Sequence, residues 1–172
     1  AKFGNGKDYQ KSNTDLTKYL LEIIAKYNPK LKRFIYLSSI GAVDRKLGDN
    51  CKNALDENSK CFPSSDYGRS KLESEIIIKN STIPYTIIRP AMVVGEDMRF
   101  NSHFSVFIRS TINNSLFSKI AWPGTFSVIH VDDLVKSILH ISQNDKTDGK
   151  IYYCAGSNIS IADAFKYCNP NK

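Results

Sequence analysis

The sequence lacks several features that would each define a class of protein. No apolar run approaches the roughly 20 residues that a helix needs to cross a bilayer, so we do not expect a membrane protein. No internal repeat or low-complexity tract is present. The four cysteines show no Cys-x-x-Cys spacing, so no metal site is expected. Cys51 and Cys61 flank a polar stretch and could form a disulfide, but reduced thiols in a cytoplasmic protein are favoured.

The composition is typical of one globular domain. The 172 residues are enough for a single core, and 41% hydrophobic with 24% charged residues do not indicate disorder. The net charge is +7, from 24 basic and 17 acidic residues. Because the basic residues are scattered and form no recognition motif, nucleic acid is not an expected partner. A positive field around a phosphate-bearing small molecule explains the charge equally well.

Short apolar runs alternate with segments of helical periodicity, which predicts an α/β fold. The runs Arg33–Leu37, Tyr85–Ile88 and Ile151–Cys154 are short and continuous, as buried parallel strands are, and we expect the third to be the last strand. Between residues 16 and 27, apolar side chains recur at helical spacing and predict a helix that covers a sheet face. This expected stripe consists of Leu16, Tyr19, Leu20, Ile23, Ile24 and Tyr27.

A tyrosine and a lysine stand four residues apart in another predicted helix, which begins after the polar lead-in 64–66. At this spacing Tyr67 and Lys71 project from one helix face. A fixed positive charge beside a phenol favours the phenolate, so we expect the pKa of Tyr67 to fall from about 10 toward neutral pH. Such a pair can exchange a proton with a substrate hydroxyl. Alone the pattern is weak, and a half-buried ring beside a solvated amine is the competing interpretation.

Other segments accompany this pair in a fixed order. They are Arg33-Phe34-Ile35-Tyr36-Leu37-Ser38-Ser39 upstream, and downstream Ile87-Ile88-Arg89-Pro90, Ile129-His130-Val131-Asp132-Asp133 and Gly149-Lys150-Ile151-Tyr152-Tyr153. Together with Tyr67-Gly68-Arg69-Ser70-Lys71 they resemble the extended short-chain dehydrogenase/reductase superfamily, of the NAD-dependent epimerase/dehydratase type. The resemblance covers residues 9–165. It implies the C-terminal part of a Rossmann-type parallel sheet with flanking helices, plus a small substrate-binding lobe.

The resemblance also implies catalytic roles for Tyr67, Lys71 and Ser39, with NAD or NADP as cofactor. Tyr67 would take a proton from a ring hydroxyl while hydride leaves the same carbon. Lys71 would hold the phenolate and the nicotinamide ribose, and Ser39 would hydrogen-bond the reacting oxygen. The end of that strand can be aligned one residue differently, which makes Ser38 the reserve for Ser39.

Further residues are expected to contact cofactor or substrate. Cofactor contacts are expected from Tyr67, Lys71, Ser38, Pro90 and Asn13. Asn13 matches an asparagine that helps to hold the active site in this family, although a polar residue at a helix start is an equal interpretation. Substrate contacts are expected from Ser39, Arg99 and Asn101. A guanidinium suits a pyrophosphate, but Arg99 could also be a surface charge.

One departure from the family concerns its first βαβ unit. No Gly-x-Gly-x-x-Gly or Gly-x-x-Gly-x-x-Gly occurs, and such a turn holds the cofactor's pyrophosphate. We therefore expect a longer protein, with about 100 or more residues ahead of Ala1, and a fragment that is inactive alone. Residues 1–91 and 149–157 are expected to form a partial NAD(P)-binding Rossmann-like domain. Residues 92–148 and 158–172 are expected to form the smaller substrate-binding lobe.

The expected function is an NAD(P)-dependent oxidoreductase of the epimerase/dehydratase type, acting on a nucleotide sugar or a related hydroxyl or carbonyl substrate. Epimerisation (an isomerase reaction), dehydration and reduction all stay open, as does a homodimer. The alternative is a non-catalytic NAD(P)-binding scaffold or sensor of the same fold. Because the tyrosine, the lysine and a serine are all present, the enzyme is the favoured interpretation.

Overall fold

The computed structural model describes residues 6–46, 48–49, 54–96, 98, 124–160 and 163. The chain divides into two units. The first, called here the sheet unit, comprises Phe3–Pro90 and Ser137–Cys154. The second unit comprises Ala1–Lys2, Ala91–Lys136 and Ala155–Lys172. No helix among the described residues is long and apolar enough to cross a membrane.

The sheet unit is built on a parallel sheet. Among the described residues its strands are β1 (Phe34–Leu37), β2 (Tyr85–Pro90) and β5 (Lys150–Cys154), in the order β1-β2-β5. Both pairings are parallel, which confirms the α/β fold expected from the short apolar runs. Parallel strands end at one edge of the sheet, so the residues after β1 and β2 lie where open α/β sheets place their ligands.

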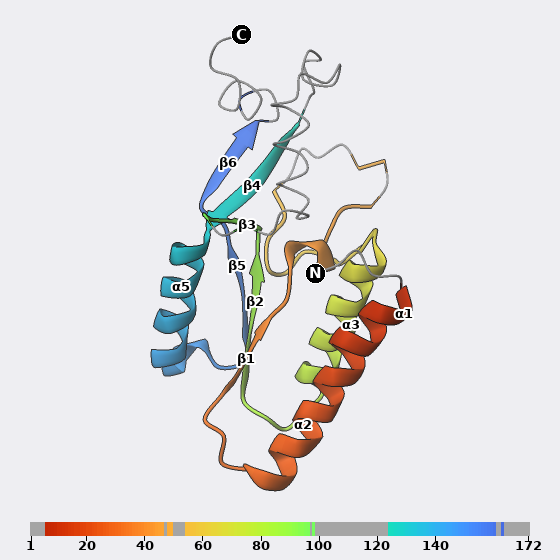
Figure 1. Ribbon diagram of the computed structural model, residues 1–172, viewed down its shortest axis with the longest axis vertical. Helices are drawn as coiled ribbons and strands as arrows, with labels where there is room; N and C mark the ends of the chain where they lie inside the picture. The colour runs from red at the N-terminus through yellow and green to blue at the C-terminus, as the bar shows by residue number, and fades with distance from the viewer. Residues whose placement is uncertain are drawn as a thin grey trace. The chain divides into compact units, whose positions relative to one another are not determined.

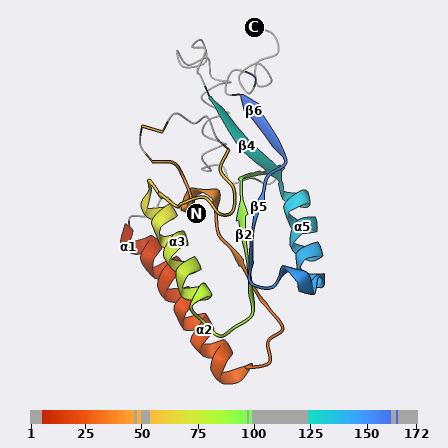
Figure 2. The ribbon, with the colours of Figure 1, turned by 180° about the vertical axis from the view of Figure 1, so that it is seen from behind.

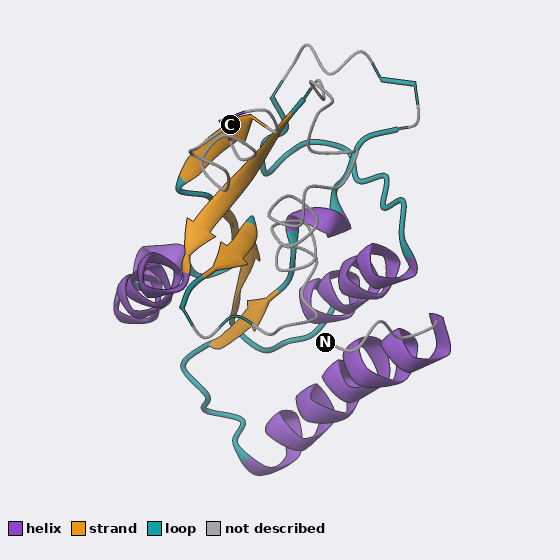
Figure 3. Cartoon of the chain, turned by 45° about the horizontal axis from the view of Figure 1, so that its top comes forward, coloured by secondary structure: helices purple, strands orange, loops and turns teal. Residues whose placement is uncertain are grey.

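Helices cover the two faces of this sheet. A nearly continuous helix consists of α1 (Gly6–Tyr9), a π-helical turn η1 (Gln10–Asp15) and α2 (Leu16–Tyr27). It lies beside α3 (Asp66–Lys79) on one face, as Figures 1 and 3 show. The helix α5 (Val131–Gln143) begins in the second unit, and its residues from 137 onward lie on the opposite face of the sheet (Figure 2).

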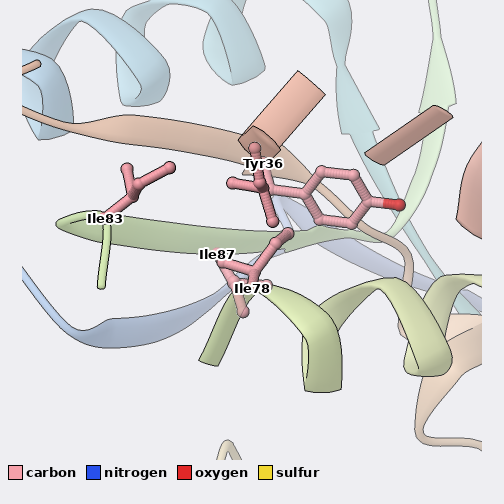
Figure 4. Close-up of a cluster of buried hydrophobic side chains, with 5 residues drawn as sticks. Tyr36, Ile78, Ile83 and Ile87 are labelled. Atoms are coloured by element: carbon pink, nitrogen blue, oxygen red, sulfur yellow. The ribbon is translucent and has the colours of Figure 1, made fainter. Parts of the chain in front are cut away.

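A hydrophobic cluster joins α2 and α3 to the sheet. Figure 4 shows its buried side chains, which are Leu21, Tyr36, Ile78, Ile83 and Ile87. Ile78 and Ile87 have no exposed surface, and burying a side chain of this size stabilises a fold by about 1.5–3 kcal/mol. The cluster therefore holds α3, which carries Tyr67 and Lys71, against β1, which Ser39 follows.

Only part of the expected apolar stripe of α2 packs on the sheet: Ile24 packs against the cluster. Leu16, Tyr19 and Tyr27 are 49%, 59% and 71% exposed, whereas Thr17 and Leu21 are buried. The expected stripe was therefore wrong in part, because it counted apolar residues alone and left out Thr17. The Thr17 hydroxyl has an internal partner, the phenol of Tyr36, so burial leaves it hydrogen-bonded.

The second unit contains a small mixed sheet. Among the described residues its order is β3-β4-β6, where β3 (Met92–Val94) pairs in parallel with β4 (Thr125–His130). The third strand, β6 (Ser157–Ser160), pairs antiparallel with β4. The expectation that β5 is the last strand was therefore wrong. The run Ser-Asn-Ile-Ser is too polar to predict a strand, and its pairing depends on a partner distant in sequence.

The end of α5 and the turn that follows it group with the sheet unit, which includes residues 137–154. Arg33, just before β1, explains this grouping. Its Nη1 donates to the carbonyl oxygens of Ile141 and Asn144, both at 2.9 Å, and to Oγ1 of Thr147 at 2.8 Å. One guanidinium thus ties the end of α5 and the turn η4 (Asp145–Thr147) to the sheet. The expected division into a Rossmann-like domain and a substrate-binding lobe stays a prediction.

Candidate functional site

Ser38 and Ser39 follow β1 and have different partners. Ser39 begins the short 3₁₀ turn η2 (Ile40–Ala42), where its Oγ accepts from the Gly41 N–H at 3.1 Å. With that lone pair used, its hydroxyl proton can serve the phenol of Tyr67, to which the Ser39 side chain is hydrogen-bonded. Ser38 is buried, and its hydroxyl donates to Oε1 of Glu75 at 2.5 Å. The structure thus brings Ser39, the preferred serine, to the tyrosine.

A close approach of two backbones places Tyr67 beside Ser39. The helix α3 begins at Ser65, whose Oγ accepts from the Gly68 N–H at 3.0 Å. A Cβ on Gly68 would lie 2.2 Å from the carbonyl oxygen of Gly41 in η2. No side chain fits in that space, so glycine at this position is what lets α3 lie against η2. Tyr67, the preceding residue, therefore reaches the serine.

Lys71 lies one turn after Tyr67, and its ammonium is held at the end of β1. Among the described residues, Nζ donates to the carbonyl oxygen of Leu37 at 2.8 Å and to the hydroxyl of Tyr36 at 3.4 Å. Nζ lies 5.9 Å from the centroid of the Tyr67 ring and 4.8 Å from that of Tyr36. An ammonium has three donors, so one is left for a further acceptor.

The electrostatics of the pair differ from the sequence-based expectation. Burial raises the pKa of Tyr67, and so does the nearby Tyr9, while the hydrogen bond with Ser39 lowers it only in part. The expected fall of this pKa toward neutral pH was therefore wrong. The ammonium of Lys71 is hydrogen-bonded to β1, and burial lowers the pKa of Lys71 as well. At neutral pH Tyr67 is a protonated phenol.

The first helical segment supports the tyrosine from the other side. The ring of Tyr9 packs edge-on against that of Tyr67, with centroids 5.5 Å apart. Asn13 lies in the π-helical turn, and its Nδ2 donates to Oγ of Ser70 at 2.9 Å; Ser70 in turn donates to the carbonyl oxygen of Tyr67 at 2.8 Å. π-Helical turns often mark functional sites. Sequence reasoning selected Asn13 but missed Tyr9, for which no pattern pointed inward.

A buried ion pair beneath the site was also missed. Glu75 accepts from Nε of Arg89 at 3.0 Å and from Nη2 at 2.6 Å, and both side chains are at most 2% exposed. The same carboxylate accepts from Ser38, so one group joins α3, β1 and β2. The signal was available, because Glu75 follows Lys71 by one helical turn and Tyr67 by two.

Pro90, another expected cofactor contact, is the last residue of β2 and pairs with Cys154 of β5. It therefore lies at the edge of the sheet where the parallel strands end. Arg99 and Asn101 fall outside the described residues. In the second unit, the His130 Nδ1 accepts from the Asp132 N–H at 3.3 Å at the start of α5. Near it is a hollow of about 490 Å³, and the described residues that line it are Val93, Val94, Gly95, Glu96, Met98, His130, Val131 and Asp132.

The sequence matches the NAD dependent epimerase/dehydratase family over residues 1–155. The chain belongs to this family. This match confirms the resemblance to the epimerase/dehydratase type that the sequence motifs indicated, and the Rossmann-type architecture agrees with it.

Solved structures and a curated relative resemble the chain over most of its length. A UDP-glucuronic acid 4-epimerase from Bacillus cereus, in complex with UDP-glucuronic acid and NAD, is 27% identical; the match covers 88% of this chain and 48% of that one, with a TM-score of 0.71. A UDP-glucose 4-epimerase from Thermotoga maritima, with UDP-glucose, is 23% identical over 94% of this chain and 53% of its own, with a TM-score of 0.70.

The curated relative is named as an NADH dehydrogenase subunit and not as an epimerase. The mitochondrial NADH dehydrogenase [ubiquinone] 1 alpha subcomplex subunit 9 of Dictyostelium discoideum is 23% identical over 163 residues, 93% of this chain and 40% of that protein. The chain therefore spans about half the length of the solved structures and less than half of this subunit.

Proposed function

We propose that the full-length protein catalyses NAD(P)-dependent hydride transfer at a hydroxyl-bearing or carbonyl carbon, as an epimerase or dehydratase of a nucleotide sugar does. The observation that carries the proposal is the grouping of Ser39, Tyr67 and Lys71 within one unit. The tyrosine is hydrogen-bonded to the serine, and the lysine ammonium lies 5.9 Å from the tyrosine ring. Membership of the epimerase/dehydratase family supports the same chemistry.

Each of the three residues has a distinct task in this reaction. Tyr67 exchanges a proton with the substrate oxygen. Because its pKa is raised by burial, the phenol is ready to give a proton to a carbonyl oxygen at neutral pH. To accept a proton from an alcohol it must first ionise, and the Ser39 hydroxyl and the Lys71 ammonium stabilise the phenolate that results. Ser39 also shares the negative charge that develops on the substrate oxygen.

The described residues fit the nicotinamide end of a dinucleotide. Lys71 keeps one donor beyond Leu37 and Tyr36, and we assign it to a ribose hydroxyl. Tyr67 and Pro90 flank the same sheet edge, whereas the hydroxyl of Ser38 is already used by Glu75. When bound, NAD or NADP supplies the group that accepts or donates hydride. We infer that Asn13 keeps Tyr67 in place through Ser70.

The substrate class is proposed from the solved relatives. The Bacillus cereus epimerase holds UDP-glucuronic acid and the Thermotoga maritima epimerase holds UDP-glucose. A nucleotide sugar is therefore our proposed substrate, with Ser39 at the reacting carbon. Arg99 and Asn101, which lie outside the described residues, stay proposed contacts for its phosphates. A homodimer and a cytoplasmic location likewise stay proposals.

A second candidate is a non-catalytic NAD(P)-binding subunit of a larger assembly. The observation that favours it is the 23% identity to a mitochondrial NADH dehydrogenase subunit over 93% of this chain. The two candidates differ in turnover and in assembly. The scaffold predicts that the native protein migrates within a large complex and converts no nucleotide sugar.

The test uses the protein expressed at its full natural length. We incubate it with NAD⁺ or NADP⁺ and a panel of UDP- and dTDP-sugars, and follow reduced cofactor by absorbance and epimers by NMR. Tyr67→Phe, which keeps the ring, should lower turnover by about 10²-fold or more while cofactor affinity is retained. Tyr19→Phe, on the exposed side of α2, is the matched control and should keep full activity.

Two outcomes would reject the enzyme. One is a Tyr67→Phe variant that keeps more than about a tenth of the wild-type rate, against that expectation. The other is a wild-type protein that binds NAD(H) but is inert with every sugar and co-purifies with partner subunits, which would establish the scaffold instead.

A further inference from the structure

A second tyrosine faces Lys71 from the sheet. Tyr36 lies in β1, and its hydroxyl accepts from Nζ of Lys71 at 3.4 Å. Its ring faces the same ammonium, with Nζ 4.8 Å from the centroid. The ammonium therefore lies near two phenol rings, one on its own helix and one on β1. An ammonium over an aromatic face is electrostatically attracted, the more so where water is excluded.

The two tyrosines have different surroundings. Tyr36 is 9% exposed and belongs to the hydrophobic cluster; Figure 4 shows its ring beside Ile78 and Ile87 and its hydroxyl directed away from them. That hydroxyl is also hydrogen-bonded to Ser74 of α3 and Thr17 of α2. Tyr67, in contrast, is bonded to Ser39 at the strand end. Tyr67 is half-buried at the end of the sheet, whereas Tyr36 is buried in the cluster that joins β1, α2 and α3.

We propose that Tyr36 is a positioning residue, which acts through Lys71 by anchoring its ammonium at the end of β1, within reach of Tyr67. The inference rests on the proposed function, because it assigns a task within the same site. Tyr36 itself exchanges no proton with substrate. Burial raises the pKa of Tyr36, so its hydroxyl stays neutral and can accept from the ammonium at all physiological pH values.

Glu75 is another charged group near Lys71, and its oxygens already have other hydrogen-bond partners. Glu75, one turn further along α3, raises the pKa of Lys71 by its charge. Its two oxygens, however, already accept from Arg89 of β2 and from Ser38, and the Arg89 charge opposes its own. Among the residues that the structure describes, Tyr67 and Tyr36 are the other titratable groups that face the ammonium. The Nζ acceptors among the described residues are the Leu37 carbonyl and the Tyr36 hydroxyl.

The test is Tyr36→Phe in the full-length protein. This change keeps the ring and its packing and removes the hydroxyl. Loss of an acceptor destabilises the ammonium, so the pKa of Lys71 should fall by about one pH unit. We measure it by competitive acetylation with acetic anhydride across pH, with mass spectrometry of the peptide that carries Lys71. The alkaline limb of the turnover profile, where the ammonium is lost, should move to lower pH by the same amount.

Two controls separate positioning from stability. Tyr85→Phe removes a hydroxyl from a ring that packs against the same hydrophobic cluster, and should change neither the acetylation profile nor the pH profile. Ile87→Val lowers stability from within the cluster without touching Lys71, so it shows what destabilisation alone does.

The outcomes are distinct for each claim. If Lys71 of the Tyr36→Phe variant is acetylated with the same pH dependence as in the wild type and the two controls, the positioning role is wrong. If the wild type converts no substrate but the acetylation profile shifts in Tyr36→Phe alone, the anchor is established and the proposed function fails.

Discussion

Ser38 and Ser39 are adjacent in sequence, yet their hydroxyls serve different elements. Ser39 is hydrogen-bonded to Tyr67, and Ser38 donates a hydrogen bond to the buried carboxylate of Glu75. Successive residues of an extended chain point to opposite sides, so only one of two adjacent serines can face the tyrosine. The assignment of Ser39 thus depends on where the strand turns into η2.

This difference makes a prediction for two alanine variants. Ser39→Ala should lower kcat by about 10-fold or more, because it removes a donor from the developing oxyanion, with little change in stability. Ser38→Ala should instead lower the free energy of unfolding by about 1–3 kcal/mol, because a buried carboxylate loses a hydrogen bond, with little change in kcat. Initial rates and urea titrations measure both. If the two variants exchange these effects, Ser38 is the catalytic serine.

At the scale of elements, the contact between α3 and η2 sets the geometry of the site. Gly68 lies opposite the Gly41 carbonyl, where a Cβ would be 2.2 Å from the oxygen and 3.2 Å from Cβ of Pro63. The obstructing oxygen is a backbone atom and cannot rotate away. An added methyl group must therefore push the helix and the turn apart, and this separates Tyr67 from Ser39.

Gly68→Ala should therefore destabilise the fold by about 1–3 kcal/mol, the usual cost of overpacking, and should also reduce the turnover of the folded fraction. Gly41→Ala is the matched control on the opposing backbone. Among the described residues, its Cβ would meet Oγ of Ser39 at an ordinary 3.5 Å, so this variant should keep most of its stability. Urea titrations and initial rates compare the two. Equal stability of both variants would show that the close approach does not constrain the helix.

At the scale of the whole molecule, buried tyrosines make stability depend on alkaline pH. Burial raises the pKa values of Tyr36, Tyr67 and Tyr153. A group whose pKa is higher in the folded state binds its proton more tightly there, and this stabilises the fold. The stabilisation is complete below the pKa of the unfolded chain, about 10, and is lost as the pH rises through the pKa of the folded state. Burial lowers the pKa of Lys71, which acts in the opposite direction near pH 10.5.

Burial raises the pKa of Cys154 as well, so four groups act against one and predict a net loss of stability at alkaline pH. The urea midpoint should fall as the pH rises above about 10, where the tyrosines of the unfolded chain titrate. Tyr153→Phe should reduce this fall, because the variant has no proton to lose in the folded state. Tyr27→Phe, at a side chain that is 71% exposed, should leave the fall unchanged. A fall of the same size in all three proteins would show that other groups control alkaline unfolding.

The sequence by itself determined the order and type of the main elements. The strands β1, β2 and β5 have apolar runs that suit a sheet buried on both faces, and α2 and α3 have helical spacing with a clear N-cap at Ser65. The pairing of Tyr67 with Lys71 followed from local helical geometry, since residues four apart share a face. These features depend on neighbours in sequence, so they could be predicted.

Only the tertiary structure decided the features that join distant segments. Which face of α2 is buried depended on a hydroxyl partner for Thr17 that lies in β1, and β6 depended on β4. The direction of the Tyr67 pKa depended on burial, which outweighed the hydrogen bond with Ser39. The partners of Lys71 and Glu75 come from β1 and β2, which no spacing within α3 reveals. Hydrogen bonds and burial between remote residues are set by packing, and packing is not encoded in any single local pattern.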